Sequence, residues 1–296
     1  MLDLIMNILL FFFLITLFSF LYIIYMYMQT PKKQKKVIVF DMDETLGSFV
    51  QLGIFTSIIE QHIHRSLSQD EFNIFMDMFP LYQRPNIITI LQYLKKKKQQ
   101  GICNNIYIYT NNQGPKEWAL FIKQYFEYKL NYPLFDKVIH AYKANNIQVE
   151  KNRTTHNKTI GDFFKCTNVT KNAQICFLDD QYHPYMLNPN VYYLHLNEYE
   201  HYYEPTYMFE KFKEEFQLSN MYISYLQNSD QSVYLDFKDK KKHMDLSKEK
   251  KISIKILNEL KYFIQYFGKP ITRKSKYKQN YTRKKNAQRH PYKQIH

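Results

Sequence analysis

Short runs of β-branched and aromatic residues alternate along the chain with longer stretches that carry apolar residues at helical spacing. Each short run is apolar throughout, which is typical of a strand buried on both faces of a parallel sheet. The pattern predicts five strands, at residues 37–40, 106–109, 135–140, 175–178 and 191–194. Helical stripes lie between and after them. We therefore expect an α/β fold with a doubly wound parallel sheet in residues 37–268.

A helical insertion is predicted directly after the first strand. Residues 54–64 and 69–78 both show helical spacing of apolar positions within the insertion, which covers residues 48–83. Ser68 and Glu71 are spaced as the two members of a capping box, so they mark the start of the second helix. Such an insertion would cap a site or line a substrate groove.

The N-terminal stretch 4–28 has 25 residues without a charge. As a helix it would be ~37 Å long, enough to cross the ~30 Å hydrocarbon core of a bilayer. A secretory signal peptide fits poorly, because no Lys or Arg precedes the run. Four lysines lie in the basic juxtamembrane linker 29–36. The positive-inside rule then predicts a single-pass membrane protein with its N-terminus outside and its folded domain in the cytosol.

The net charge of +14 over 296 residues is concentrated outside the predicted folded domain, which is close to neutral. Residues 269–296 contain ten Lys or Arg and no acid, with no hydrophobic period. We expect this basic tail to be disordered and to contact anionic lipid, an acidic protein or nucleic acid. The three cysteines have no metal-ligand spacing, so they indicate neither a zinc site nor a disulfide framework.

Four polar groups follow predicted strands or precede a predicted helix. They are, in chain order, Asp41-x-Asp43, Thr110, Lys158 and Asp179-Asp180. Phosphoryl transfer through a covalent intermediate needs a carboxylate nucleophile and a second carboxyl group for proton transfer. It also needs a hydroxyl and an ammonium to hold the phosphate oxygens, and Mg²⁺ to cancel the repulsion between anions. Lys151 and Lys165 lie close to Lys158 in sequence and remain alternatives to it.

The order and spacing of these groups resemble the haloacid dehalogenase superfamily of phosphohydrolases. The stretch Phe40-Asp-Met-Asp-Glu-Thr-Leu46 resembles its branch of C-terminal-domain phosphatases, also called the NLI-interacting-factor-like family. The likeness runs from about residue 37 to 199 and includes Arg84-Pro85, Tyr109-Thr110 and Phe177-Leu-Asp-Asp180. It implies a Rossmann-like fold and Mg²⁺-dependent protein serine/threonine phosphatase activity. Large DNA viruses also encode members of this family.

The resemblance also implies roles for individual residues. Asp41 would be the nucleophile and Asp43 the general acid and base, while Thr110 and Lys158 would bind the substrate phosphate. The metal ligands would be Asp41, the backbone carbonyl of Asp43, and Asp180, with Asp179 in or next to that shell. Thr45 would brace the loop by a local hydrogen bond. Asn111-Asn112 after Thr110, Asp180 at a position that is often Asn, and the helical insertion depart from the family pattern.

These inferences predict a membrane-anchored phosphatase that acts on phosphoserine or phosphothreonine in a phosphoprotein. Two alternatives stay open. One is a phosphatase of small phosphorylated metabolites or nucleic-acid ends on the same fold. The other is a catalytically inactive, membrane-tethered module that binds phosphoproteins. A helical cap over the site would favour small substrates, and an open groove would favour peptides.

Overall fold

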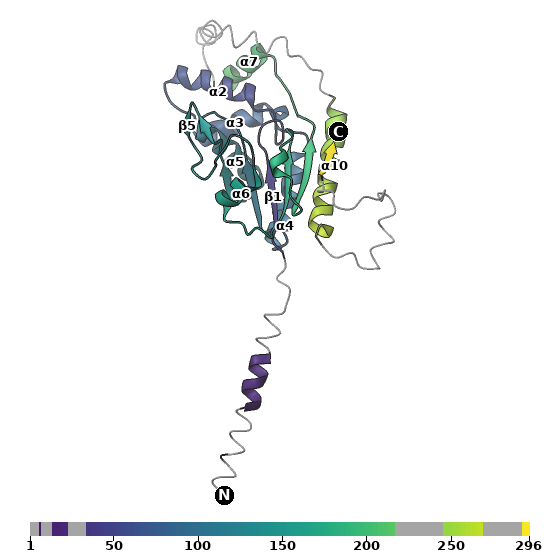
Figure 1. The fold of residues 1–296 in the computed structure, drawn as a ribbon. Coiled ribbons are helices and arrows are strands. Elements are labelled where there is room, and N and C mark those ends of the chain that lie inside the picture. The colour runs from purple at the N-terminus through teal and green to yellow at the C-terminus, as the bar shows by residue number, and fades with distance from the viewer. Residues whose placement is uncertain (1–5, 7–13, 23–33, 217–244, 269–291) are drawn as a thin grey trace. The chain divides into compact units, whose positions relative to one another are not determined.

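The computed structural model describes residues 6, 14–22, 34–216, 245–268 and 292–296. These residues divide into two units, one within residues 1–34 and one within residues 35–296. The second unit is an α/β structure whose main sheet has six strands, all parallel, flanked by helices (Figure 1). The predicted fold class is confirmed at this level.

The six strands of the main sheet follow the order β3-β2-β1-β6-β7-β8. Five of them match the predicted strands to within a few residues. Their bounds are β1 Lys36–Phe40, β2 Asn105–Tyr109, β3 Lys137–Ile139, β6 Gln174–Asp179, β7 Val191–Leu196 and β8 Tyr292–Ile295. The chain builds outward from β1 through β2 to β3, and then returns to the other side of β1 with β6. The strand order therefore reverses between β1 and β6.

Successive residues of each strand point to opposite faces, and both faces are buried. In β1, Ile38 and Phe40 join one apolar core with α4 Ile87–Gln99, α5 Lys116–Leu130 and α10 Leu246–Tyr266. Val37 and Val39 join a second core with α6 Ile160–Thr167 and the short helix η2 Pro184–Met186. Burial on both faces explains why the central part of each strand is an unbroken apolar run.

The insertion is helical, as predicted. It contains α2 Val50–Ile63, α3 Gln69–Met78 and the short helix η1 Pro80–Tyr82. The capping box is present: Glu71 N donates to Ser68 Oγ at 3.3 Å, and Ser68 N donates to Glu71 Oε2 at 2.8 Å. An aromatic cluster joins the insertion to α7 Pro205–Phe216, with the Phe55 ring centroid 5.0 Å from that of Phe209.

A short hairpin lies on the chain between β3 and α6. Its strands are β4 Lys143–Ala144 and β5 Ile147–Gln148, paired antiparallel. Asn145 and Asn146 connect them, both with positive φ, and asparagine tolerates that conformation better than most residues.

The first unit contains a helix over residues 14–22, within the predicted membrane span 4–28. Among the residues that the structure describes, no helix is both long and apolar enough to cross a bilayer. Most of the predicted span lies outside those residues, so the anchor stays a prediction.

Two boundary assignments need correction. Lys36, counted with the basic linker, is a buried residue of β1 whose Nζ donates to the carbonyl oxygen of Phe267 at 3.0 Å. The prediction of a disordered tail over 269–296 was wrong for its last residues, since β8 pairs with β7 and buries Ile295. Residues 269–291 lie outside the described part of the chain.

Candidate active site

The predicted nucleophile and the predicted metal ligands lie at the ends of the two strands between which the strand order reverses. Asp41 comes directly after β1, and Asp179 is the last residue of β6. These strands are neighbours, with Phe40 opposite Leu178, so the two carboxylates lie at the same edge of the sheet. In open α/β sheets this edge, where the strand order reverses, is the place at which ligands bind.

Three carboxylates and one lysine converge there. One oxygen each from Asp41, Asp179 and Asp180 lies within 4.8 Å of the other two. Lys158 Nζ donates to Asp179 Oδ2 at 2.7 Å and also to Asp41 Oδ1. Asp41, Lys158 and the Asp179-Asp180 pair lie in three distant parts of the sequence, so the fold itself assembles the cluster.

Negative charge exceeds positive charge in this cluster. Burial raises the pKa of Asp41, and the neighbouring carboxylates raise it further against the opposing charge of Lys158. Burial also raises the pKa of Asp180, as does Asp179. For Asp179 itself, burial is outweighed by Lys158 and His183, which lower its pKa.

This charge balance and the donor set fit a hard divalent cation. Three carboxylates supply the oxygen ligands that Mg²⁺ prefers. A cation would also offset the burial and the neighbouring carboxylates that together raise the pKa values of Asp41 and Asp180. The residues that could hold it are therefore Asp41, Asp179 and Asp180.

The loop between Asp43 and Gly47 is fixed by buried hydrogen bonds. Glu44 has a φ of 55°, a left-handed conformation that needs support from its surroundings in a residue other than glycine. Arg84, which is 1% exposed, donates through Nη2 to Glu44 O at 2.6 Å and through Nε to Thr45 O at 2.8 Å. At Gly47, a Cβ atom would lie 2.2 Å from Tyr82 O, so only glycine fits.

Thr45 connects this loop to the carboxylate cluster. Its Oγ1 donates to Asp180 Oδ1 at 3.1 Å and accepts from Asp180 N at 3.1 Å. The predicted bracing hydrogen bond exists, but it is not local: it joins the loop after β1 to the loop after β6. Thr45 thereby holds Asp180 in place beside Asp41.

Asp43 lies outside the carboxylate cluster and has its own partner. Asn112 Nδ2 donates to Asp43 Oδ2 at 2.9 Å, whereas Asp43 Oδ1 is buried and has no hydrogen-bond partner among the described residues. Burial raises the pKa of Asp43 to about 6, against the opposing effect of Asn112. A carboxyl group with a pKa near neutrality can both give and take a proton.

Thr110 follows β2 at the same edge of the sheet and is 1% exposed. Its hydroxyl accepts a hydrogen bond from Asn112 N at 2.9 Å, which leaves the hydroxyl proton for donation. This position is compatible with the predicted contact to a phosphate oxygen.

Sequence reasoning missed Arg153, which joins the Thr110 loop to the Lys158 loop. This arginine is 1% exposed and donates to five groups: the carbonyl oxygens of Thr110 at 3.1 Å, His140 at 3.0 Å, His156 at 2.9 Å and Asn157 at 3.3 Å, and Asn111 Oδ1 at 2.8 Å. Asn111-Asn112, read from the sequence only as a departure from the family pattern, contacts both Arg153 and Asp43. An arginine in a polar stretch carries no sequence signal of burial.

The structure favours Lys158 over the two alternative lysines. Lys158 is 2% exposed within the cluster. Lys165 lies on α6 with its Nζ 3.5 Å from Asp162, and Lys151 is exposed. Two histidines border the carboxylates, with His183 Nε2 3.3 Å from Asp179 Oδ1 and His195 Nε2 2.9 Å from Asp180 O.

Comparison of the chain with protein-family models, with curated proteins and with solved structures found no match. The resemblance to the haloacid dehalogenase superfamily therefore stays a prediction from the motifs.

Proposed function

We propose that this chain is a Mg²⁺-dependent phosphatase of the haloacid dehalogenase type that acts through an aspartyl-phosphate, on phosphoserine or phosphothreonine in proteins. The convergence of Asp41, Lys158, Asp179 and Asp180 at the point where the strand order reverses carries this proposal. These groups come from three separate loops, and phosphoryl transfer is a reaction that needs all of their chemical types.

In the first step, Asp41 attacks phosphorus and the bond from phosphorus to the leaving oxygen breaks. Asp43 gives its proton to that oxygen, so the leaving group departs as a neutral alcohol. In the second step, Asp43 takes a proton from water, which attacks phosphorus and releases inorganic phosphate from Asp41. Lys158 and Thr110 hold the phosphate oxygens. A bound Mg²⁺ would stabilise the negative charge on the phosphate and the carboxylates.

A second candidate substrate class is favoured by one observation. The insertion next to the site consists of the helices α2 and α3, and helical insertions can close over small substrates. A phosphatase of small phosphorylated metabolites or nucleic-acid ends is therefore the alternative. The presence of an acidic and aromatic cleft beside Asn112, described below, supports the protein substrate instead.

The cellular setting that we propose follows from the sequence. The apolar stretch 4–28 would anchor the protein in a membrane with the catalytic unit in the cytosol. Protease added to sealed vesicles with their cytosolic side outward would digest the catalytic unit, and full protection would contradict this orientation.

Hydrolysis of an aryl phosphate by the full chain tests the proposed chemistry. We expect turnover with Mg²⁺, none after chelation by EDTA, and none in Asp41→Asn, because the amide cannot form the phosphoenzyme. Asp70→Asn is the matched control, since Asp70 is an exposed residue of α3. Undiminished turnover in Asp41→Asn would refute the nucleophile assignment.

A further inference from the structure

A cleft of about 430 Å³ lies between α2 of the insertion and the start of α5. One of its lining residues is Asn112, whose amide donates to Asp43. Since Asp43 is the group proposed to protonate the leaving oxygen, the cleft begins on the side of the site where the leaving group would lie. For a phosphoprotein substrate, that leaving group is the polypeptide itself.

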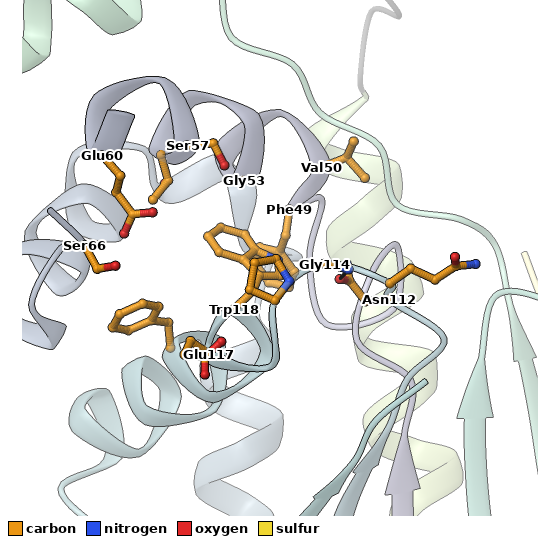
Figure 2. A pocket seen from close by; sticks show the side chains of 14 residues that line it. Phe49, Val50, Gly53, Ser57, Glu60, Ser66, Asn112, Gly114, Glu117 and Trp118 are labelled. Atoms are coloured by element: carbon orange, nitrogen blue, oxygen red, sulfur yellow. Dashed lines mark hydrogen bonds between the residues drawn. The ribbon is translucent and has the colours of Figure 1, made fainter. Parts of the chain in front are cut away.

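The walls of the cleft combine aromatic rings with carboxylates. Trp118 and Phe121 of α5 and Phe49 before α2 supply the rings. Figure 2 shows Glu60 reaching from α2 into the space that Trp118 and Glu117 face from α5. Among the described lining residues there is no lysine, arginine or histidine. The two glutamates therefore make the electrostatic environment of the cleft negative, and the aromatic side chains give it flat ring surfaces.

The polar lining of the cleft includes one buried hydroxyl that lacks a hydrogen-bond partner within the described part of the chain and one carboxylate that is held in place. Thr56 lines the cleft and is 3% exposed, and its hydroxyl has no hydrogen-bond partner among the described residues. Glu60 Oε1 accepts from Leu67 N at 2.8 Å, which holds the carboxylate in place while the side chain stays partly exposed. A buried polar group without a partner is costly, so a ligand that donates hydrogen bonds would be favoured here.

A second cleft, of about 580 Å³, has Asp180 in its lining and contains more carboxylates than basic groups. Its lining includes the carboxylates of Glu198, Glu200, Asp245 and Glu249, which outnumber the basic groups there, Lys248 and His195. A substrate segment that reaches both clefts therefore meets carboxylates in each of them. This arrangement disfavours acidic sequences around the phosphorylated residue and favours basic ones.

Building on the proposed function, we infer that the cleft between α2 and α5 binds an arginine side chain of the phosphoprotein, close in sequence to the phosphorylated residue. A guanidinium is planar, stacks on aromatic faces and carries five donors, so it matches Trp118, the carboxylates and the Thr56 hydroxyl together. An ammonium would satisfy the charge but stack less well, and an apolar side chain would leave the acceptors unpaired.

The fluorescence of Trp118 provides a test that does not depend on turnover, because it is the only tryptophan of the chain. In a set of phosphoserine peptides, each peptide would carry a single arginine at a different position within about four residues of the phosphoserine, a reach of roughly 13 Å in an extended chain. Each peptide would be titrated into the full chain with EDTA present. The comparison peptides carry neutral citrulline at the same position. We expect about tenfold tighter binding for arginine at one or more positions. Equal affinity at every position would overturn the inference.

Two variants of α2 locate the effect. Ser57 lines the cleft and Gln61 does not, although both are exposed on the same helix. Ser57→Lys places a cation in the cleft and should lower the affinity for the arginine peptide about tenfold, whereas Gln61→Lys should leave it unchanged. The same response in both variants would show a general charge effect and would overturn the assignment to this cleft.

The two proposals fail separately. Absence of aryl phosphate hydrolysis, together with selective arginine binding, would contradict the phosphatase and leave a binding cleft. Hydrolysis without any preference for arginine would retain the phosphatase and refute the cleft assignment.

Discussion

Asn112 Nδ2 lies 2.9 Å from Asp43 Oδ2 and donates a hydrogen bond to it. The backbone of the same residue donates to Thr110 Oγ1, also at 2.9 Å. Asn112 therefore fixes the positions of the proposed acid and the proposed phosphate-binding hydroxyl relative to each other, and it also lines the cleft between α2 and α5. We regard it as a positioning residue.

Substitution of Asn112 should affect poor leaving groups most. In Asn112→Ala, Asp43 loses its orienting donor, so we expect kcat for alkyl phosphates to fall about tenfold, a fraction of the full effect of a general acid. A nitrophenyl phosphate should lose less than about twofold, because its leaving oxygen hardly needs a proton. The measurement is kcat against leaving-group pKa, with Gln113→Ala, exposed beside Asn112, as the control. An equal loss for both substrates would contradict the positioning role.

Removal of the Thr45 hydroxyl should weaken metal binding. In Thr45→Val, Asp180 loses both a donor to Oδ1 and an acceptor for its amide. Residues that orient metal ligands typically change metal affinity about 10- to 100-fold. We expect a corresponding rise in the Mg²⁺ concentration for half-maximal activity and for the Mg²⁺-dependent increase in the unfolding midpoint. Thr89→Val, at an exposed position of α4, should behave as the parent chain.

Loss of the Lys158 charge should destabilise the protein and should be partly reversed by Mg²⁺. Lys158→Met leaves Asp41 and Asp179 buried without their cation, and breaking a buried ion pair in this way costs about 3–5 kcal/mol. Urea unfolding with and without Mg²⁺ would measure both effects. Lys165→Met should change the free energy of unfolding by less than about 0.5 kcal/mol, since Lys165 is exposed. A neutral outcome for Lys158→Met would contradict the charge balance described for the site.

The features that sequence reasoning predicted correctly are those with a short-range signal. Strands buried on both faces carry an unbroken apolar run in their central part, which allowed β1, β2, β6 and β7 to be predicted. Because the carboxyl ends of parallel strands meet at one edge, polar residues that follow those strands were expected to converge. Asp41, Asp179 and Asp180 do converge, with Lys158 between them.

The features that it missed depend on long-range contacts. Arg84 and Arg153 are almost fully buried, and several of their partners are backbone carbonyls far along the chain, such as that of Asn197 for Arg84 and that of Thr110 for Arg153. No local sequence pattern predicts such contacts. Lys36 lies in a run of lysines that was assigned to the basic linker, but in the structure its side chain is buried against Phe263 of α10. In β8, a single apolar residue faces the core, so the strand could not be distinguished from the basic tail around it.

The start of α3 gives a pH-dependent contribution to stability. Arg65 and Ser68 hydrogen-bond to Glu71 and lower its pKa from 4.5 to about 2. A carboxyl group with a lowered folded-state pKa stabilises the fold above its unfolded pKa and loses that effect as the pH falls through the interval between the two values. Glu71→Gln should therefore lower the free energy of unfolding by about 0.5–1 kcal/mol at pH 7, given that the ion pair is largely exposed. The difference should shrink between pH 5 and pH 3, and a constant difference would contradict the assignment.

Docking of β8 on the sheet makes a prediction about the C-terminal residues. Ile295 is 5% exposed and belongs to the main core, while its neighbour Gln294 is exposed. Ile295→Ala should lower the free energy of unfolding by about 2 kcal/mol, because it removes buried methyl groups from an edge strand. Gln294→Ala should have little effect on the free energy of unfolding, since Gln294 is exposed and its substitution leaves the burial of Ile295 intact. Equal effects of the two variants in urea unfolding would show that β8 does not contribute to the sheet. A larger effect at Ile295 would show that at least this end of the basic tail is part of the folded unit. In the structure this end lies beside the candidate site, because the Tyr292 hydroxyl contacts His195 Nδ1 and His195 Nε2 contacts Asp180 O.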